Sequence, residues 1–209
     1  AYRGVFGTHV ALILRRLLRL ARHYGASPQV LAASATIANA REHAEALTGL
    51  PFEELKAQVA RTERELLVLL PRPWDRRGGR RRGPLLGAAY LARRRAEAGL
   101  RGLVFAGARK SAELIARYAA HPLVRPYRAG YTARERRRLE ADLKEGRVRV
   151  LVSTSALELG VDIGELDAVV LVGYPGSTAA FWQRAGRAGR GERRALLVYI
   201  PREDPMDEY

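Results

Sequence analysis

Cysteine is missing from the 209-residue sequence, which excludes disulfide bonds, thiol catalysis and cysteine-ligated metal centres. No apolar run approaches the roughly 18 residues that a membrane-spanning helix needs. We therefore expect a cytoplasmic protein without membrane contact, and 47% hydrophobic residues are enough to form a core. The sequence also predicts no metal site, because the histidines lack the spacing of metal ligands: His9, His23, His43 and His121.

Motifs that bind nucleotide phosphates are missing as well. The sequence has no Gly-x-x-x-x-Gly-Lys-Ser/Thr loop, and no Asp-Glu-x-His or Asp-Glu-x-Asp box. Magnesium therefore has no evident carboxylate ligand, and an attacking water has no evident base. No Gly-x-Gly-x-x-Gly follows a first strand, which disfavours an unrelated Rossmann-type enzyme.

Basic residues outnumber acidic ones, and the excess lies in one part of the chain. The net charge is +15, of which residues 1–70 carry +3 and residues 71–209 carry +12. A basic region of this size indicates a polyanionic partner, most commonly nucleic acid.

The pattern of apolar residues in 1–70 predicts a segment that contains both helices and strands. We expect helices at 8–24 and 39–48, a short buried strand at 28–33, and strand-like stretches at 57–61 and 66–70. The Pro-, Arg- and Gly-rich run that follows cannot build a packed core, so it predicts a linker. The expected organisation is therefore a first part, a linker and a second domain: 1–70, 71–84 and 85–209.

Apolar strands alternate with helices in residues 85–209. This pattern predicts an α/β fold, with a parallel sheet covered by helices on both faces. Ligands of such sheets bind at the carboxyl ends of the strands. The expected helices are 85–98, 108–120, 132–145 and 178–187, and the expected strands are 101–106, 124–128, 148–153, 167–172 and 195–200.

The segment Gln183–Arg190 combines three arginines with two glycines. Taken as one short helix, it places Gln183, Arg187 and Arg190 at i, i+4 and i+7 on one face. Glycine allows a ligand or a facing domain to come close, and forked guanidinium groups suit a polyphosphate. The alternative is an arginine-rich face in contact with solvent.

Four segments at strand ends resemble motifs III, IV, V and VI of superfamily 2 helicases, in that order. They are Ser34-Ala35-Thr36, Phe105–Arg109, Ser153–Gly164 and Gln183–Arg190. The opening Tyr2–Val10 is similar to the sequence after the DExH box of bacterial helicases of the mitomycin-repair-factor type, which are 3′-to-5′ DNA translocases. The resemblance covers the whole chain and implies RecA-like domains.

The resemblance implies nucleotide contacts in motifs V and VI. Arg187 and Arg190 match the arginines that face the γ-phosphate and would act as arginine fingers. Gln183 matches the glutamine near the nucleotide, and Gly160 and Asp162 match positions near the ribose and phosphates. Asp162 could instead be a carboxylate that caps a loop.

Motifs III, IV and V also imply nucleic-acid contacts and coupling. Thr154 and Ser155 match positions that contact the nucleic-acid backbone, and Arg109 resembles a phosphate-binding arginine. Ser34 and Thr36 resemble the triplet that couples hydrolysis to domain movement. Arg109 could instead be solvated at a helix start, and the triplet could be a simple strand-to-helix turn.

The missing motifs I and II imply a helicase core without its first half. The resemblance then implies a complete second RecA-like domain, the C-terminal part of the first, and an ATP and Mg²⁺ site that lies mostly in an N-terminal ATPase half outside the chain. The implied enzyme is an ATP-dependent DNA helicase acting on single-stranded DNA or a duplex with a single-stranded tail, and this chain alone is expected to be inactive.

Three features leave alternatives open. The chain could be a non-catalytic nucleic-acid-binding or regulatory module that kept the fold, and the coding sequence upstream of Ala1 would distinguish the two. The arginine runs 76–82 and 134–138 could follow a DNA backbone, although Glu135 and Glu140 favour a solvated face for the second run. The acidic end, which includes Asp207, is expected to be an ordinary tail.

Overall fold

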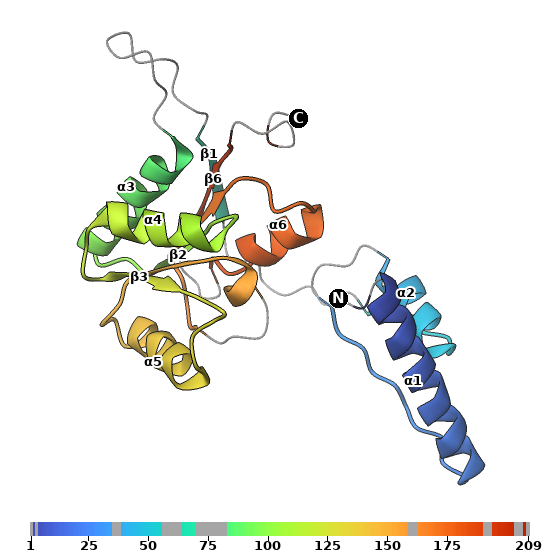
Figure 1. Ribbon diagram of the computed structural model, residues 1–209. Helices are drawn as coiled ribbons and strands as arrows, with labels where there is room; N and C mark the ends of the chain where they lie inside the picture. Colours follow the sequence, from blue (N-terminus) through green and yellow to red (C-terminus); the bar gives the residue numbers. More distant parts are fainter. Residues whose placement is uncertain are drawn as a thin grey trace. The chain divides into compact units, whose positions relative to one another are not determined.

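The computed structural model describes residues 2, 4–34, 39–55, 64–69, 83–158, 163–189, 194–202 and 207. The chain divides into two compact units, which we name the N-terminal unit (Ala1–Ala60) and the sheet unit (Arg61–Tyr209). Figure 1 shows the helices and strands of both. No helix of the described residues is both long and apolar enough to cross a membrane.

Two helices form the described core of the N-terminal unit, α1 (Gly4–His23) and α2 (Ala40–Thr48). Arg15 joins them, because its Nη2 donates to the carbonyl oxygen of Ala46 at 2.8 Å. Gly49 ends α2 in the left-handed conformation at φ +74°, which favours glycine. Both predicted helices are confirmed.

The buried strand expected at residues 28–33 is wrong. This segment has no regular secondary structure and is largely exposed, with Leu31 at 87%. A strand needs a hydrogen-bonded neighbour, and the described residues of the N-terminal unit contain no strand that could pair with it.

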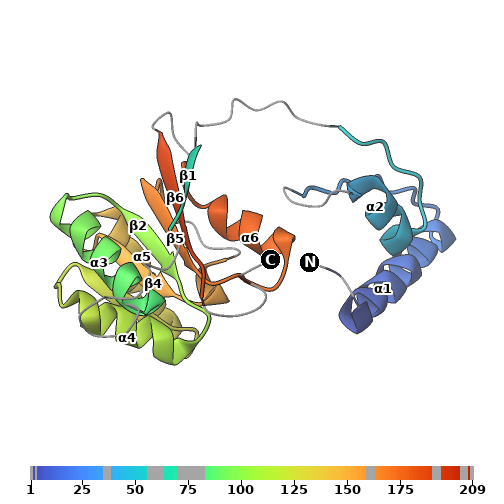
Figure 2. The same ribbon diagram turned by 90° about the horizontal axis from the view of Figure 1, so that it is seen from above.

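Six parallel strands form the sheet unit, in the order β1-β6-β5-β2-β4-β3. Helices connect most of them, so the predicted α/β fold with a parallel sheet is confirmed (Figure 2). The strands are β1 (Arg64–Val68), β2 (Gly102–Phe105), β3 (Val124–Tyr127), β4 (Val150–Ser153), β5 (Ala168–Val172) and β6 (Ala195–Ile200). The helices are α3 (Pro84–Glu97), α4 (Arg109–Ala119), α5 (Ala133–Lys144) and α6 (Thr178–Ala185), with a 3₁₀ turn η1 (Ser155–Leu157).

Successive side chains of the central strands point to opposite faces and form two cores. One face packs Val104, Val152 and Val170 against α3 and α4, and the alanines of α3 allow that helix to approach closely. The other face packs residues such as Leu103 and Leu151 against α5 and α6. Both faces of the sheet are therefore covered.

The division between the units differs from the expected boundary at residues 70 and 71. The structure divides the chain between Ala60 and Arg61, because β1 pairs in parallel with β6 and so joins the sheet that follows the Arg/Gly/Pro-rich run. The boundary expected from the sequence was based on the Pro-, Arg- and Gly-rich composition of 71–84. The run itself lies outside the described residues except for its end at Gly83 and Pro84.

Candidate functional site

The carboxyl ends of the parallel strands lie at one edge of the sheet. The segments that follow β2, β4, β5 and β6 therefore gather at that edge, and they carry most of the residues singled out in the sequence. Parallel pairing of Phe105 with Ser153 and with Leu171 brings the ends of β2, β4 and β5 into register.

The segment Gln183–Arg190 is not a single helix. Helix α6 ends at Ala185, and the chain then turns through residues 186–189. A Cβ at Gly186 would lie 2.9 Å from the carbonyl oxygen of Trp182, and Gly189 has φ +69° and donates its N–H to Leu166. These glycines serve the turn, so the predicted shared helical face of Gln183, Arg187 and Arg190 is wrong.

Arg187 lies in this turn with only 6% of its surface exposed. Its Nε and Nη2 both donate to the carbonyl oxygen of Glu158, at 3.2 and 2.8 Å. Glu158 follows η1, so the guanidinium joins the turn after α6 to the segment after β4. In this structure Arg187 thus connects the regions that resemble motifs VI and V.

A second link between the same segments is the ion pair of Arg184 and Glu158. Arg184 Nε lies 3.0 Å from Glu158 Oε2, and the two side chains are 12% and 14% exposed. The guanidinium also lies over the ring of Phe105, 5.5 Å from its centre, at the end of β2. We name Arg184, Arg187 and Glu158 the arginine–glutamate cluster. The sequence did not predict the pair of Arg184 and Glu158, because 26 positions separate the two residues and no motif or spacing links them.

Asp207 is buried and hydrogen-bonded, contrary to the expectation that it belongs to an ordinary tail. Its carboxylate accepts from the backbone N–H of Tyr174, the hydroxyl of Tyr199 and the backbone N–H of Arg202, and its side chain is 1% exposed. Burial and this carboxylate raise the pKa of Tyr199 above its ordinary value.

The side chain of Arg202 packs against the loops that follow β2 and β5, at Gly107 and Gly173. Its Nε lies 3.7 Å from Asp207, and its Nη1 would lie 3.0 Å from a Cβ placed on Gly107. Gly173, with φ +78°, also leaves no room for a Cβ beside this guanidinium. Arg202 had no motif to mark it in the sequence.

The remaining predicted residues divide between the units. Thr154 is partly buried and Ser155 is exposed at η1, while Arg109 is exposed at the start of α4, all at the carboxyl edge. Gln183 is partly buried on α6. Ser34 is exposed in the N-terminal unit. Four further predicted residues lie outside the described part of the chain: Thr36, Gly160, Asp162 and Arg190.

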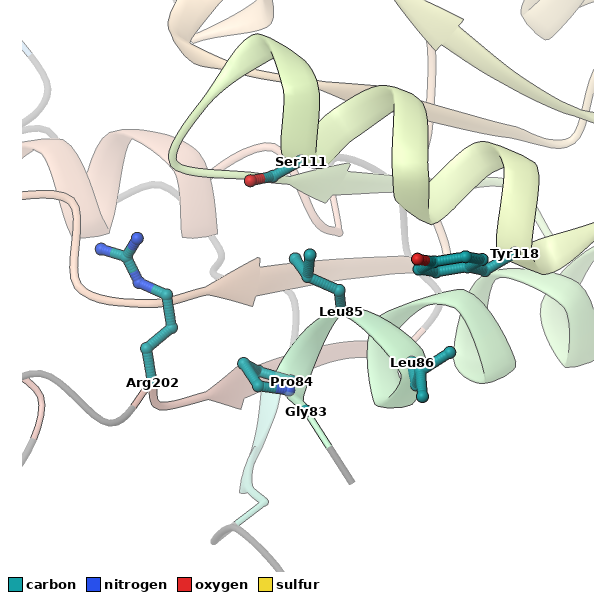
Figure 3. A pocket seen from close by; sticks show the side chains of 7 residues that line it. All are labelled: Gly83, Pro84, Leu85, Leu86, Ser111, Tyr118 and Arg202. Atoms are coloured by element: carbon teal, nitrogen blue, oxygen red, sulfur yellow. The ribbon is translucent and has the colours of Figure 1, made fainter. Parts of the chain in front are cut away.

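A pocket of about 660 Å³ is lined by the start of α3, by Ser111 and Tyr118 of α4, and by Arg202 after β6. In Figure 3 the guanidinium of Arg202 and the hydroxyl of Ser111 lie on one side of it, and Tyr118 and Leu86 lie on the other. None of the sequence-predicted site residues lines this pocket. Among the described residues, no group of three or more His, Asp or Glu side chains could hold a metal ion.

The sequence has close relatives among helicases. It matches the family described as the helicase conserved C-terminal domain over residues 87–192. It is 40% identical to the uncharacterized ATP-dependent helicase YprA of Bacillus subtilis, covering 100% of this chain and 29% of that protein. It is 33% identical to the ATP-dependent helicase hrq1 of Schizosaccharomyces pombe, covering 100% of this chain and 21% of that protein.

Solved structures give the same result. The crystal structure of the DUF1998 helicase MrfA bound to DNA and AMPPNP is 39% identical, with a TM-score of 0.88 over 100% of this chain and 30% of that one. The C-terminal domain of the DEAD-box protein Dbp5 shares the fold, at 20% identity and a TM-score of 0.51 over 71% of this chain and 81% of its own.

The chain thus spans less than a third of the length of the YprA, hrq1 and MrfA helicases. The family match extends over slightly more than half of the 209 residues, and the six-stranded parallel sheet agrees with it. The protein therefore belongs to the family of the helicase conserved C-terminal domain, the RecA-like C-terminal domain of superfamily 2 helicases.

Proposed function

We propose that the chain is part of an ATP-dependent DNA helicase. The sheet unit would be the second RecA-like domain, and the N-terminal unit would belong to the first. The observation that supports this most is the buried contact of Arg187 with the carbonyl of Glu158. It joins the segment expected to contact DNA to the segment expected to contact the nucleotide, so a change in one would be transmitted to the other.

On the nucleotide side, Arg187 and Arg190 would stabilise charge on the γ-phosphate of ATP, with Gln183 beside the nucleotide. Bound ATP would supply the phosphoryl group whose hydrolysis drives movement. Arg187 would exchange the carbonyl of Glu158 for a phosphate oxygen, since both accept hydrogen bonds from a guanidinium. Gly160 and Asp162 would lie near the ribose and phosphates.

The described residues suit phosphate better than magnesium. Guanidinium groups are present at the carboxyl edge of the sheet, whereas the described part contains no cluster of three or more His, Asp or Glu side chains that could hold a metal ion. The Mg²⁺ ligands, the phosphate-binding loop and the base for the attacking water would come from an ATPase region outside these 209 residues.

On the DNA side, Arg109, Thr154 and Ser155 would contact the phosphate backbone, and Ser34 with Thr36 would couple hydrolysis to domain movement. Arg109 and Ser155 are exposed, and all three DNA-side residues lie at the carboxyl edge where the ends of β2 and β4 are in register. Relatives such as MrfA, whose structure contains DNA, support this assignment.

The proposal is tested by titrating fluorescein-labelled single-stranded DNA with the 209-residue protein at low salt and following anisotropy. Only Arg109 of the three contacts neutralises a phosphate, so they predict weak binding, with a slope of log affinity against log salt concentration of about −0.7. Combined replacement of Arg109 by Gln and of Thr154 and Ser155 by Ala should remove most of this binding. Arg93→Gln is the matched control, because Arg93 is exposed but paired with Glu97.

Two results would contradict the proposal. Absence of DNA binding by the unmodified protein at low salt would refute the DNA contacts. ATP hydrolysis by the pure protein, abolished by Arg190→Ala, would refute the assignment of the ATPase residues to a region outside the chain.

A further inference from the structure

Every acidic side chain of α5 already has a partner. Glu135 accepts from the backbone N–H and the hydroxyl of Thr132, both at 2.8 Å, and so closes the N-terminal capping box. Glu140 accepts from the hydroxyl of Tyr127 at 2.7 Å, and Asp142 accepts from Arg147 at 2.7 Å. None of these carboxylates therefore forms an ion pair with Arg134, Arg137 or Arg138, although each keeps its negative charge or shares it with Arg147.

Three arginines of the same helix have no such partner. Arg134, Arg137 and Arg138 are exposed, and none of them forms a hydrogen bond or ion pair with another described residue. They stand at i, i+3 and i+4, so they share one face of α5. We name these three residues the α5 arginine face. The three arginines are in contact with solvent, as expected for this run, and Glu135 and Glu140 direct their hydrogen bonds to Thr132 and Tyr127 instead.

The arrangement works against the helix that carries it. Arg134 lies in the first turn, where the helix dipole disfavours a cation. Like charges three and four positions apart repel each other and destabilise the helix. Glu135 in the same turn and its capping box offset part of this cost, but the repulsion among the three arginines remains, and a local arrangement that opposes stability is typical of a binding surface.

We infer that the α5 arginine face binds the phosphate backbone of duplex DNA, as an additional contact on the helix that follows β3. This inference rests on the proposed DNA binding and assigns it a second set of residues. The three Cα positions span about 6 Å of helix, and the long side chains extend this reach across neighbouring phosphates.

The composition of α5 favours duplex over single-stranded DNA. Proteins that bind single strands provide aromatic side chains on which bases stack. The sequence of α5, Ala133–Lys144, contains no aromatic residue, so its face offers charge and nothing for an exposed base to stack on. Backbone recognition by charge alone suits a duplex, whose bases are already stacked and whose charge density is high.

The experiment compares a 20-base-pair duplex with a single strand of the same length, using fluorescence anisotropy and the 209-residue protein. The test variant carries Arg134→Gln, Arg137→Gln and Arg138→Gln. The control variant carries Arg41→Gln, Arg93→Gln and Arg94→Gln, which changes the net charge equally but replaces arginines paired with glutamates.

We expect the test variant to lose tenfold or more in duplex affinity at low salt. The slope of its log affinity against log salt concentration should be less steep by about 3. Its single-strand affinity should change less than threefold, and the control should stay close to the unmodified protein in both. Its thermal midpoint should be unchanged or higher, because the repulsion on α5 is removed.

Four outcomes would overturn the inference. Unchanged duplex binding in the test variant would refute it while leaving the proposed function intact, and an equal loss in the control would show a general charge effect. A larger loss for the single strand would refute the assignment to duplex DNA. Failure of the unmodified protein to bind either DNA would instead refute the proposed function, and the inference with it.

Discussion

Removal of the Glu158 carboxylate should destabilise the sheet unit measurably. Its oxygen lies 3.0 Å from Arg184 Nε, and both side chains are largely buried, at 14% and 12% exposure. Glu158→Gln keeps the shape but leaves the guanidinium of Arg184 against Phe105 without a countercharge. The contact of Arg187 with the main-chain carbonyl of Glu158 is retained, so the substitution isolates the ion pair.

The size of the effect follows from burial. A hydrogen bond to a charged group contributes roughly 1.5–3 kcal/mol, and breaking a fully buried ion pair costs about 3–5 kcal/mol. Because some solvent reaches the pair, we expect Glu158→Gln to lower the free energy of unfolding by about 2–3 kcal/mol. Replacing Glu158 by Leu together with Arg184 by Met should restore much of it, since hydrophobic residues of similar volume often replace such a pair without loss.

Urea unfolding followed by Trp182 fluorescence is the suitable assay. Trp182 lies on α6 beside Arg184 and reports on the sheet unit, and Trp74→Phe as a background leaves it as the sole tryptophan. Glu97→Gln, which breaks an exposed pair on α3, is the control and should change little. A loss below about 0.5 kcal/mol for Glu158→Gln, the range of ordinary surface substitutions, would refute the reasoning.

Two further predictions concern buried polar groups. Asp207→Ala should lower the free energy of unfolding by at least about 3 kcal/mol in the same urea assay, because it leaves Tyr174, Tyr199 and Arg202 without their acceptor. A loss within about 0.5 kcal/mol would show that these three hydrogen bonds do not stabilise the sheet unit. Burial and the hydrogen-bonded carboxylate of Glu140 raise the pKa of Tyr127 to about 12. The protonated Tyr127 therefore contributes fully to the free energy of unfolding below its ordinary pKa near 10, and this contribution is lost as the pH rises towards 12, at up to roughly 1.4 kcal/mol per pH unit. Urea midpoints between pH 9 and 11 should therefore fall less steeply in Tyr127→Phe, and parallel slopes would refute this.

The sheet could be predicted from the sequence because its signal is local. Short apolar runs such as 167–172 alternate with helical patterns, and each run is long enough to define a strand before any contact is known. The exception is residues 28–33, where the same apolar pattern gives no strand. Strand formation also depends on a neighbour, and one segment of sequence does not contain that information.

Strand topology is enough to predict where the candidate site residues lie, but not which side chains they contact. Arg109, Thr154 and Ser155 follow strand ends, so topology alone places them together. The partners of Arg187 and Arg184 depend on a segment 26 or more positions away, and no spacing rule identifies Glu158. The sequence predicts that the glycines of Gln183–Arg190 let a ligand come close. In the structure a Cβ at Gly186 would instead clash with the carbonyl oxygen of Trp182, so contacts within the chain explain this glycine.

The net charge of +15 includes two kinds of arginine that composition cannot separate. Arg184 and Arg187 are largely buried and donate to Glu158, so they join the segments after β4 and α6 and contribute little to the field outside the protein. The arginines of the α5 face have no acceptor among the described residues and project their charge into solvent. Long-range attraction of a polyanion should therefore depend on the second kind, whereas coupling between the segments after β4 and α6 should depend on the first. Substitutions in the two sets should consequently be separable, with salt-dependent association changed by one set and the free energy of unfolding by the other.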